Sequence, residues 1–249
     1  MIQGKSPCRI LVMASGHGSN FQALIDAISV GELPDSRIIS LITNRKNAHA
    51  TARAEKAGQV FLILGIPWEY SNLISHGFLQ RGESDEQKVT EGRQNYDSAL
   101  AARILSGGQE KPELIVLAGW MHVFSTAFLE PLEKAGVKII NLHPALPGMF
   151  RKHSSRAPYS YISVGEFDGA RAIERAFEEL KAGRIKRTGI MAHYVIDEVD
   201  RGEPIITQEI EWNGEELEEL EKKIHSYEHG LIVRATAMVA KAILDRRDI

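Results

Sequence analysis

The sequence is poor in three features that would point to a secreted, membrane-bound or nucleic-acid-binding protein. Its one cysteine, Cys8, cannot form an internal disulfide, so nothing calls for an oxidising compartment. Its longest apolar runs, such as residues 10–14 and 60–64, are far shorter than the roughly 20 residues that span a bilayer, and residues 10–14 are too short for a signal peptide. With 30 basic and 33 acidic side chains, the net charge of −3 favours neither nucleic acid nor an anionic membrane. We therefore expect a cytoplasmic protein.

The apolar residues, 43% of the 249 positions, follow the pattern of an α/β protein. Short runs rich in Ile and Val alternate with stretches of helical period, which predicts a mostly parallel, twisted sheet flanked by helices. Strands are expected at residues 9–14, 38–43, 60–64, 114–118, 137–142, 190–196 and 204–211. Helices are expected at residues 21–28, 51–57, 83–105 and 170–181. No repeat or linker interrupts the pattern, so residues 1–249 are predicted to form one domain.

A last helix is predicted to start near Asn213, because asparagine often caps helix N-termini. Its apolar stripe would consist of Leu217, Leu220, Ile224, Tyr227 and Leu231.

The loop at residues 15–20 (SGHGSN) joins a predicted buried strand to an amphipathic helix. Backbone N–H groups at a helix N-terminus can bind phosphate, and glycine lets the backbone approach a ligand closely. The loop is not the dinucleotide-binding fingerprint, because Phe21 takes the third glycine position, and it lacks the Gly-Lys-Ser/Thr end of a P-loop. The loop alone leaves a phosphate site and a plain strand-to-helix turn equally open.

Asn141 and His143 come at the end of the predicted strand 137–142, and Pro144 stiffens the exit. Open α/β sheets bind ligands at the carboxyl ends of their strands, so both side chains are expected to face a cleft. The alternative is a histidine that is simply hydrogen-bonded in a loop.

Residues 197–202 (DEVDRG) form a predicted turn between the strands 190–196 and 204–211. Asp197 and Glu198 are read as a solvated turn. Asp200 could instead point inward at His143, where it would hold the tautomer of the imidazole and raise its pKa.

Residues 225–229 (HSYEH) match the H-x-x-E-H pattern of one group of zinc peptidases. Tyr227 and Leu231 are assigned to the core stripe, however, and no separate acidic ligand motif is evident, so no metal is expected. No Gly-x-Ser-x-Gly elbow occurs, and Cys8 precedes the first strand, where it is read as a packed or surface residue rather than a nucleophile.

Four motifs, in this order along the chain, resemble the phosphoribosylglycinamide formyltransferases, the folate-dependent enzymes of purine synthesis. They are residues 15–20 (SGHGSN), 117–121 (LAGWM), 141–144 (NLHP) and 197–202 (DEVDRG). The resemblance covers residues 9 to about 240 and is strongest to the monofunctional fungal enzymes. It implies a Rossmann-like formyltransferase fold.

The resemblance also implies a set of site residues. The catalytic positions are Asn141, His143 and Asp200. Gly18, Ser19 and Asn20 match the loop that binds the phosphate of glycinamide ribonucleotide, and Glu228 matches a glutamate that holds the ribose hydroxyls. The folate-contacting positions are Arg93, Met121, His122, Val123, Phe124 and Asn141. His122 departs from the family pattern, in which the bacterial enzymes are expected to have arginine.

This set of residues is suited to transfer of a formyl group. The implied co-substrate is 10-formyltetrahydrofolate, whose formyl carbon is attacked by the amine of the ribonucleotide, so that negative charge builds on the formyl oxygen. A protonated His143 and the amide of Asn141 can donate hydrogen bonds to that oxygen, and such donors are worth roughly 2.7–4 kcal/mol each. Asp200 would keep His143 protonated and could relay the proton of the amine through water. No metal is needed, and the expected partners are small molecules.

Two related enzymes and one binding function are the alternatives. Methionyl-tRNA formyltransferase carries a further C-terminal domain, whereas this chain ends about one helix after Glu228. Formyltetrahydrofolate hydrolase carries an N-terminal regulatory domain, whereas the first strand here starts at Arg9. A non-catalytic nucleotide-phosphate binding module would not need the three catalytic positions.

Residues 149–165 do not fit the family pattern. They contain Arg151, Lys152 and Arg156, no acidic residue, and no helical or strand period, so they are expected to form an unstructured insertion. Deleting them restores the family pattern, and the codons for residues 148–150 and 164–165 can hold fungal splice sequences. A translated intron and a basic surface insertion near the folate site both remain open.

Overall fold

The computed structural model describes residues 6–61, 66–107, 110–147, 169–197 and 202–247. These residues form a seven-stranded sheet in the order β3-β2-β1-β4-β5-β6-β7. The strands are β1 (Cys8–Met13), β2 (Ser36–Thr43), β3 (Trp68–Tyr70), β4 (Leu114–Leu117), β5 (Lys138–His143), β6 (Arg187–Tyr194) and β7 (Pro204–Glu211). The helices are α1 (Ser19–Ser29), α2 (His49–Phe61), α3 (Glu86–Leu105), α4 (Thr126–Lys134), α5 (Gly169–Lys181) and α6 (Leu217–Arg246).

The first five strands are parallel, and the last two are antiparallel. β1 lies between β2 and β4, with Ile10 paired to Ile38 on one side and to Leu114 on the other. β5 follows β4 in parallel, whereas β6 pairs with β5 and β7 pairs with β6 in the antiparallel direction. The prediction of an α/β fold with a mostly parallel sheet is therefore confirmed.

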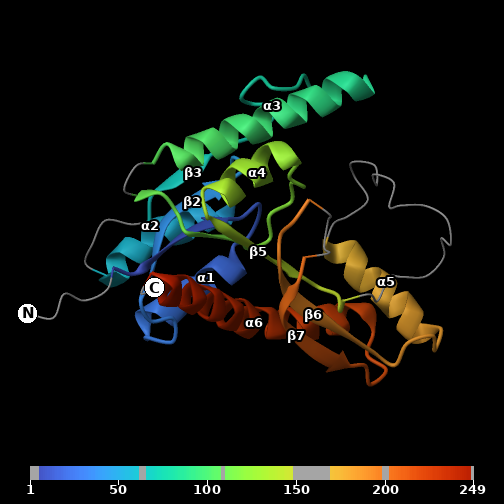
Figure 1. Ribbon diagram of the computed structural model, residues 1–249. Helices are drawn as coiled ribbons and strands as arrows, with labels where there is room; N and C mark the ends of the chain where they lie inside the picture. The colour runs from blue at the N-terminus through green and yellow to red at the C-terminus, as the bar shows by residue number, and fades with distance from the viewer. Residues whose placement is uncertain (1–5, 62–65, 108–109, 148–168, 198–201, 248–249) are drawn as a thin grey trace, which may run out of the picture.

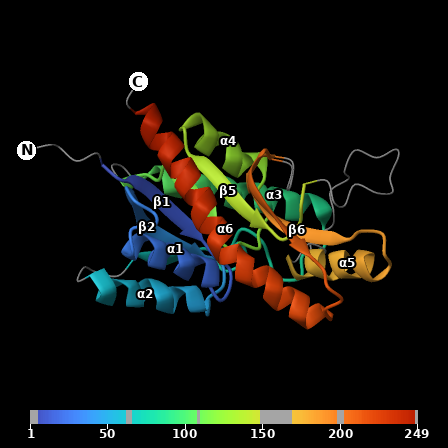
Figure 2. The ribbon, with the colours of Figure 1, turned by 90° about the horizontal axis from the view of Figure 1, so that it is seen from below.

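Helices cover both faces of the sheet (Figures 1 and 2). One face carries α1, α2, α5 and α6, and its apolar cluster is formed around Val12, Phe21 and Leu231. The other face carries α3 and α4, whose cluster is formed around Met13 and Phe128. Because side chains alternate along a strand, Val12 and Met13 contribute to opposite clusters.

Most predicted elements are present, with shifted ends. Tyr96, Leu100 and Ile104 are all buried on α3, and the predicted strand 204–211 coincides with β7. The helix α4 was not anticipated, because it is only nine residues long and contains Pro131.

The predicted strand at residues 60–64 is wrong. Val60 and Phe61 end α2, residues 62–65 lie outside the described residues, and the third strand is instead Trp68–Tyr70. A short apolar run fits a helix as well as a strand, and the first two residues of this run complete the helix that begins at His49.

The expected start of the last helix is also wrong. Gly214 adopts a left-handed conformation with φ of 89°, and the helix begins at Leu217 after this turn, so Asn213 is not its cap. Leu220, Ile224 and Leu231 form the buried stripe as predicted, but Tyr227 is 43% exposed.

Two further expectations are the unstructured insertion and the lack of a membrane span. Residues 149–165 lie outside the described residues. In the described parts of the chain, no helix combines the length and the apolar character that crossing a membrane would require.

Candidate active site

Three of the sequence motifs lie at one edge of the sheet. β1, β4 and β5 are neighbouring parallel strands, so their carboxyl ends meet there. The chain leaves β1 toward β2 on one side, while β4 and β5 lie on the other, which makes the gap between β1 and β4 the point where the strand order reverses. Ligands of open α/β sheets bind outside such a point.

The loops after β1 and β4 are tied together by Ser15. Its backbone N–H donates to the carbonyl oxygen of Gly119 at 3.0 Å, and its hydroxyl accepts from the N–H of Met121 at 2.8 Å. Ser15 is only 1% exposed, so it acts as an internal link between the two loops.

The helix α2 supports the loop after β1 from the side. Arg53 donates through Nε to the carbonyl oxygen of His17 at 2.9 Å, and the N–H of Ala50 donates to that of Gly16 at 3.3 Å. Gly18 has a φ of 74°, and a Cβ there would meet Cβ of Ala50 at 2.8 Å. Glycine is thus required where the loop turns into α1.

Asn20 and Glu228 connect the start of α1 to α6. Both are buried, and Nδ2 of Asn20 lies 3.4 Å from Oε2 of Glu228. The same carboxylate oxygen lies 3.1 Å from Nδ1 of His225. This hydrogen bond raises the pKa of His225 above its ordinary value, although partial burial opposes the change. Oδ1 of Asn20 is buried and accepts no hydrogen bond within the described structure.

Asn141 and His143 lie on the same face of β5. They are two residues apart, and the intervening Leu142 packs against the cluster on the α1 and α6 face, so both point to the opposite face. His193 pairs with Asn141 across the β5–β6 ladder, and its ring centroid is 6.5 Å from that of His143. Nδ1 of His193 is 2.8 Å from the carbonyl oxygen of Tyr194.

Side chains alternate in the loop between β4 and α4. Met121 and Val123 are 41% and 49% exposed, whereas Phe124 is buried against Trp120 and Phe128. The side chain of His122 is also turned inward and is 10% exposed. Contacts of His122 and Phe124 with a ligand would therefore come mainly from their backbone.

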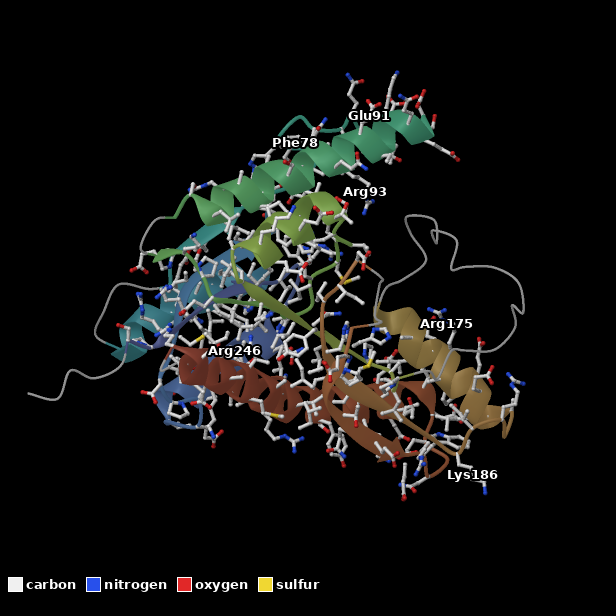
Figure 3. The ribbon with its side chains drawn as sticks, in the orientation of Figure 1. Phe78, Glu91, Arg93, Arg175, Lys186 and Arg246 are labelled. Carbon is white, nitrogen blue, oxygen red and sulfur yellow. The ribbon has the colours of Figure 1, made fainter. Side chains whose placement is uncertain are left out.

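Arg93 reaches this loop from α3. It lies on the inner side of the helix, whereas Glu91 lies on the outer side (Figure 3). Nη2 of Arg93 is 3.3 Å from the carbonyl oxygen of Val123. The predicted folate residues Arg93 and Met121–Phe124 therefore form one group.

The structure thus places the predicted residues in three groups on this edge: the loop after β1 with Asn20 and Glu228, the loop after β4 with Arg93, and the end of β5. Asp200 lies outside the described residues. Sequence reasoning missed His193, for which strand alternation opposite Asn141 was the available signal. It also missed the buried Asp97, which lies one turn of α3 from both Arg93 and Ala101.

A groove of about 810 Å³ lies between α1 and α6. Ser19 and Arg53 line one part of it, and Tyr227 and His229 line another. It adjoins the loop after β1 but is not lined by Asn141 or His143, so it is a neighbour of the expected chemistry rather than its location.

Side chains of the H-x-x-E-H pattern make other contacts in the described structure. In the described ranges, no three His, Cys, Asp or Glu side chains are grouped so that they could share an ion. Glu228 accepts from Asn20 and contacts His225, as described above.

Comparison with known proteins shows the family to which the chain belongs. The formyl transferase family model matches residues 8–236. The phosphoribosylglycinamide formyltransferase of Schizosaccharomyces pombe is 40% identical over 91% of this chain and 94% of its own length. That of Saccharomyces cerevisiae is 37% identical over 94% and 98%. The crystal structure of glycinamide ribonucleotide transformylase 1 from Symbiobacterium toebii has a TM-score of 0.68 at 25% identity and covers 96% of this chain and 90% of its own. The chain therefore belongs to the formyl transferase family and, within it, to the phosphoribosylglycinamide formyltransferases.

Proposed function

We propose that the chain transfers the formyl group of 10-formyltetrahydrofolate to the amine of glycinamide ribonucleotide through Asn141, His143 and Asp200. Membership of the family makes it a formyltransferase of purine biosynthesis that acts on small molecules. The family model spans residues 8–236, which supports a single formyltransferase domain.

The observation that carries this assignment is the convergence of three motifs on one sheet edge. β1, β4 and β5 are adjacent and parallel, so three features share the place where the strand order reverses. They are the loop at residues 15–20 (the glycine loop), the loop at residues 118–125 between β4 and α4 (the folate loop), and the pair Asn141 and His143. Loops that meet at one edge suit a site for two substrates, because the amine and the formyl carbon must approach within about 3–3.5 Å.

In the proposed reaction, the amine nitrogen forms a bond to the formyl carbon, and the bond from that carbon to N10 of the folate then breaks. His143 and Asn141 are on one face of β5 and donate to the formyl oxygen while it carries negative charge. The amine loses a proton, which passes through Asp200 and water, and N10 of the departing tetrahydrofolate gains one.

The ribonucleotide is proposed to bind at the start of α1. The N-terminus of this helix offers the N–H groups of Ser19 and Asn20 to the phosphate, and Gly18 allows a close approach. The buried Oδ1 of Asn20, which lacks a donor among the described residues, supports a hydroxyl or amine of the ligand at this point. Glu228 beside it would accept from the ribose hydroxyls.

The folate is proposed to bind along the loop between β4 and α4. Met121 and Val123 offer exposed apolar side chains there, and Arg93 brings a positive charge to the same loop. That charge suits the carboxylates of the folate tail.

The test is to incubate the chain with 10-formyltetrahydrofolate and to follow the folate absorbance with and without glycinamide ribonucleotide. We expect turnover only with the ribonucleotide. His143→Ala and Asp200→Asn should each lower kcat by about 100-fold or more, because a positioned proton-transfer group contributes at least that much. His76→Ala, a change in an exposed histidine of another loop, is the matched control. Turnover without the ribonucleotide, or full activity of His143→Ala, would contradict the proposal.

A further inference from the structure

The folate loop is held from beneath by one buried carboxylate. Asp97, on α3, is 1% exposed. Its Oδ1 is 2.6 Å from Nε2 of His122, and its Oδ2 accepts from both the N–H and the hydroxyl of Ser125 at 2.7 Å. A single side chain therefore fixes both ends of the segment 122–125.

The hydroxyl of Ser125 binds Asp97 instead of capping its own helix. Ser125 is the N-cap residue of α4, yet its hydroxyl makes no cap hydrogen bond and donates to Asp97 instead. N-cap serines usually accept from the first turn of their own helix. The hydroxyl and the N–H of Ser125 thus bind to α3, while its carbonyl oxygen accepts from the N–H groups of Phe128 and Leu129 in α4.

The ring of His122 is enclosed as well as hydrogen-bonded. It meets Tyr96 and Phe124 edge-on, with ring centroids at 5.3 Å and 5.2 Å. Burial raises the pKa of Tyr96 to about 12, so this neighbour is uncharged at neutral pH. His122 is therefore enclosed by two uncharged rings and one carboxylate, and it has one preferred orientation.

The contacts of Asp97 with His122 and Ser125 determine which side chains of the loop face outward. With His122 and Phe124 turned inward, the alternation leaves Met121 and Val123 exposed. The N–H of Met121 donates to the hydroxyl of Ser15 at the start of the loop. Farther along, Arg93 donates to the carbonyl oxygen of Val123. Arg93 and Asp97 are one turn apart on α3, so the same helix supplies both contacts.

We propose that Asp97 and His122 form a positioning pair that holds Met121 and Val123 in the orientation required to bind the folate. This inference rests on the proposed function and deepens it by naming two inward-turned side chains that set the folate site without themselves touching the folate. The pair acts on binding of the folate, and it leaves the chemical step and the ribonucleotide site, built on β1, β5 and α6, unchanged.

The experiment measures KM for each substrate and kcat for Asp97→Asn, His122→Leu and His122→Gln. Asp97→Asn and His122→Leu should raise KM for the folate about tenfold or more, because an ångström-scale displacement of a group that holds substrate can cost up to about 100-fold. KM for the ribonucleotide and kcat at saturating folate should change less than about twofold. His122→Gln keeps a nitrogen donor near Nε2 and should restore most of the folate affinity.

Glu91→Gln is the matched control. It also converts a carboxylate of α3 to an amide, but Glu91 is on the outer, exposed side of the helix (Figure 3). All kinetic constants of this variant should equal those of the starting protein.

An unchanged folate KM in Asp97→Asn, or equal effects of His122→Leu and His122→Gln, would overturn the proposal. A lower kcat, a higher KM for both substrates and a lower melting temperature, all in the same variant, would also overturn the proposal, because they would indicate only a structural role. If Asp97→Asn does not fold, the comparison of the two His122 variants decides. Calorimetric titration with tetrahydrofolate tests the pair even if the starting protein shows no turnover, which would count against the proposed function alone.

Discussion

Gly18 is the residue on which the geometry of the loop after β1, the proposed ribonucleotide site, depends most directly. We expect Gly18→Ala to lower the free energy of unfolding by about 2 kcal/mol or more and to raise KM for the ribonucleotide. A left-handed conformation costs a non-glycine residue roughly 1–2 kcal/mol, and overpacking adds to it. Here the added Cβ would meet Cβ and Cα of Ala50 at 2.8 Å and 2.9 Å. Chemical denaturation and steady-state kinetics measure the two effects.

Two other glycines separate the causes. Gly119 has a φ of 77° with open space around a Cβ, so Gly119→Ala should show the conformational cost alone, about 1 kcal/mol. Gly16 has open space and no positive φ, so Gly16→Ala should be nearly neutral in stability. If all three variants lost equal stability, the contact with Ala50 would be irrelevant.

At this scale, orientations that follow from spacing within one strand could be predicted from the sequence, whereas those set by distant contacts could not. Asn141 and His143 share a face because they are two residues apart on a strand, which spacing alone indicates. The inward orientation of His122 and Phe124 depends on Asp97, a residue 25 positions away, and on aromatic neighbours from α3 and α4. Local pattern contains no information on such a contact.

The helix α3 depends on a glycine within it. Gly92 is buried, and a Cβ there would meet the carbonyl oxygen of Phe78 at 2.5 Å and Cδ1 of Leu79 at 3.3 Å. Alanine normally stabilises a helix interior by about 1 kcal/mol relative to glycine. We expect the reverse here, with Gly92→Ala lowering the free energy of unfolding by about 1–3 kcal/mol through overpacking. Urea denaturation provides the measurement.

Ser98→Ala is the control for helix propensity in the same element. Ser98 is exposed on α3, so this change should leave stability the same or slightly higher. A gain of stability in Gly92→Ala would show that the segment around Phe78 can move away from α3 at little cost.

The elements themselves were predictable where long apolar patterns repeat, as in β1, α3 and the buried stripe of α6. The failures occurred where tertiary structure decides. The run 60–64 could not be told from a helix by composition, and the start of α6 is set by the left-handed turn at Gly214 rather than by the capping tendency of Asn213. The helix α4 contains Pro131, which masks its pattern.

At the scale of the whole molecule, α6 connects the two edges of the sheet. Its 30 residues correspond to about 45 Å. Glu228 lies near the loop after β1, and Arg247, just beyond the C-terminal end of α6, contacts Glu113 at the amino edge of the sheet. Glu113 also accepts from the backbone N–H of Arg9 at 3.1 Å. This carboxylate therefore joins the ends of β1, β4 and α6.

The stability that Glu113 contributes should depend on pH. Burial raises the pKa of Glu113, but the hydrogen bonds from Arg247 and from the backbone of Arg9 outweigh burial, so the pKa lies below its ordinary value of 4.5. Because the folded-state pKa is lowered, the stabilisation is present above pH 4.5 and is lost as the pH falls through the folded pKa. We expect Glu113→Gln to cost about 1–2 kcal/mol at pH 7 and much less once the pH has fallen below the lowered pKa of Glu113.

Thermal unfolding of both proteins across this pH range measures the difference. Glu110→Gln is the control, since its ion pair with Arg37 is exposed and such pairs are worth about 0.5 kcal/mol. A pH-independent difference for Glu113→Gln would show that its charge is not what joins the strands to α6. Neither change should alter KM, because both lie at the edge opposite the site.

The two apolar layers on opposite faces of the sheet have a consequence for genetics. The layer formed by α3 and α4 supports the loop in which the folate is proposed to bind, and the layer formed by α1, α2, α5 and α6 supports the loop proposed for the ribonucleotide. Heat-sensitive missense alleles should therefore fall into two groups, one relieved by a greater supply of folate and the other by a greater supply of ribonucleotide. Two alleles from different groups should combine additively, whereas two from the same layer should not, because only neighbours that share packing contacts are coupled.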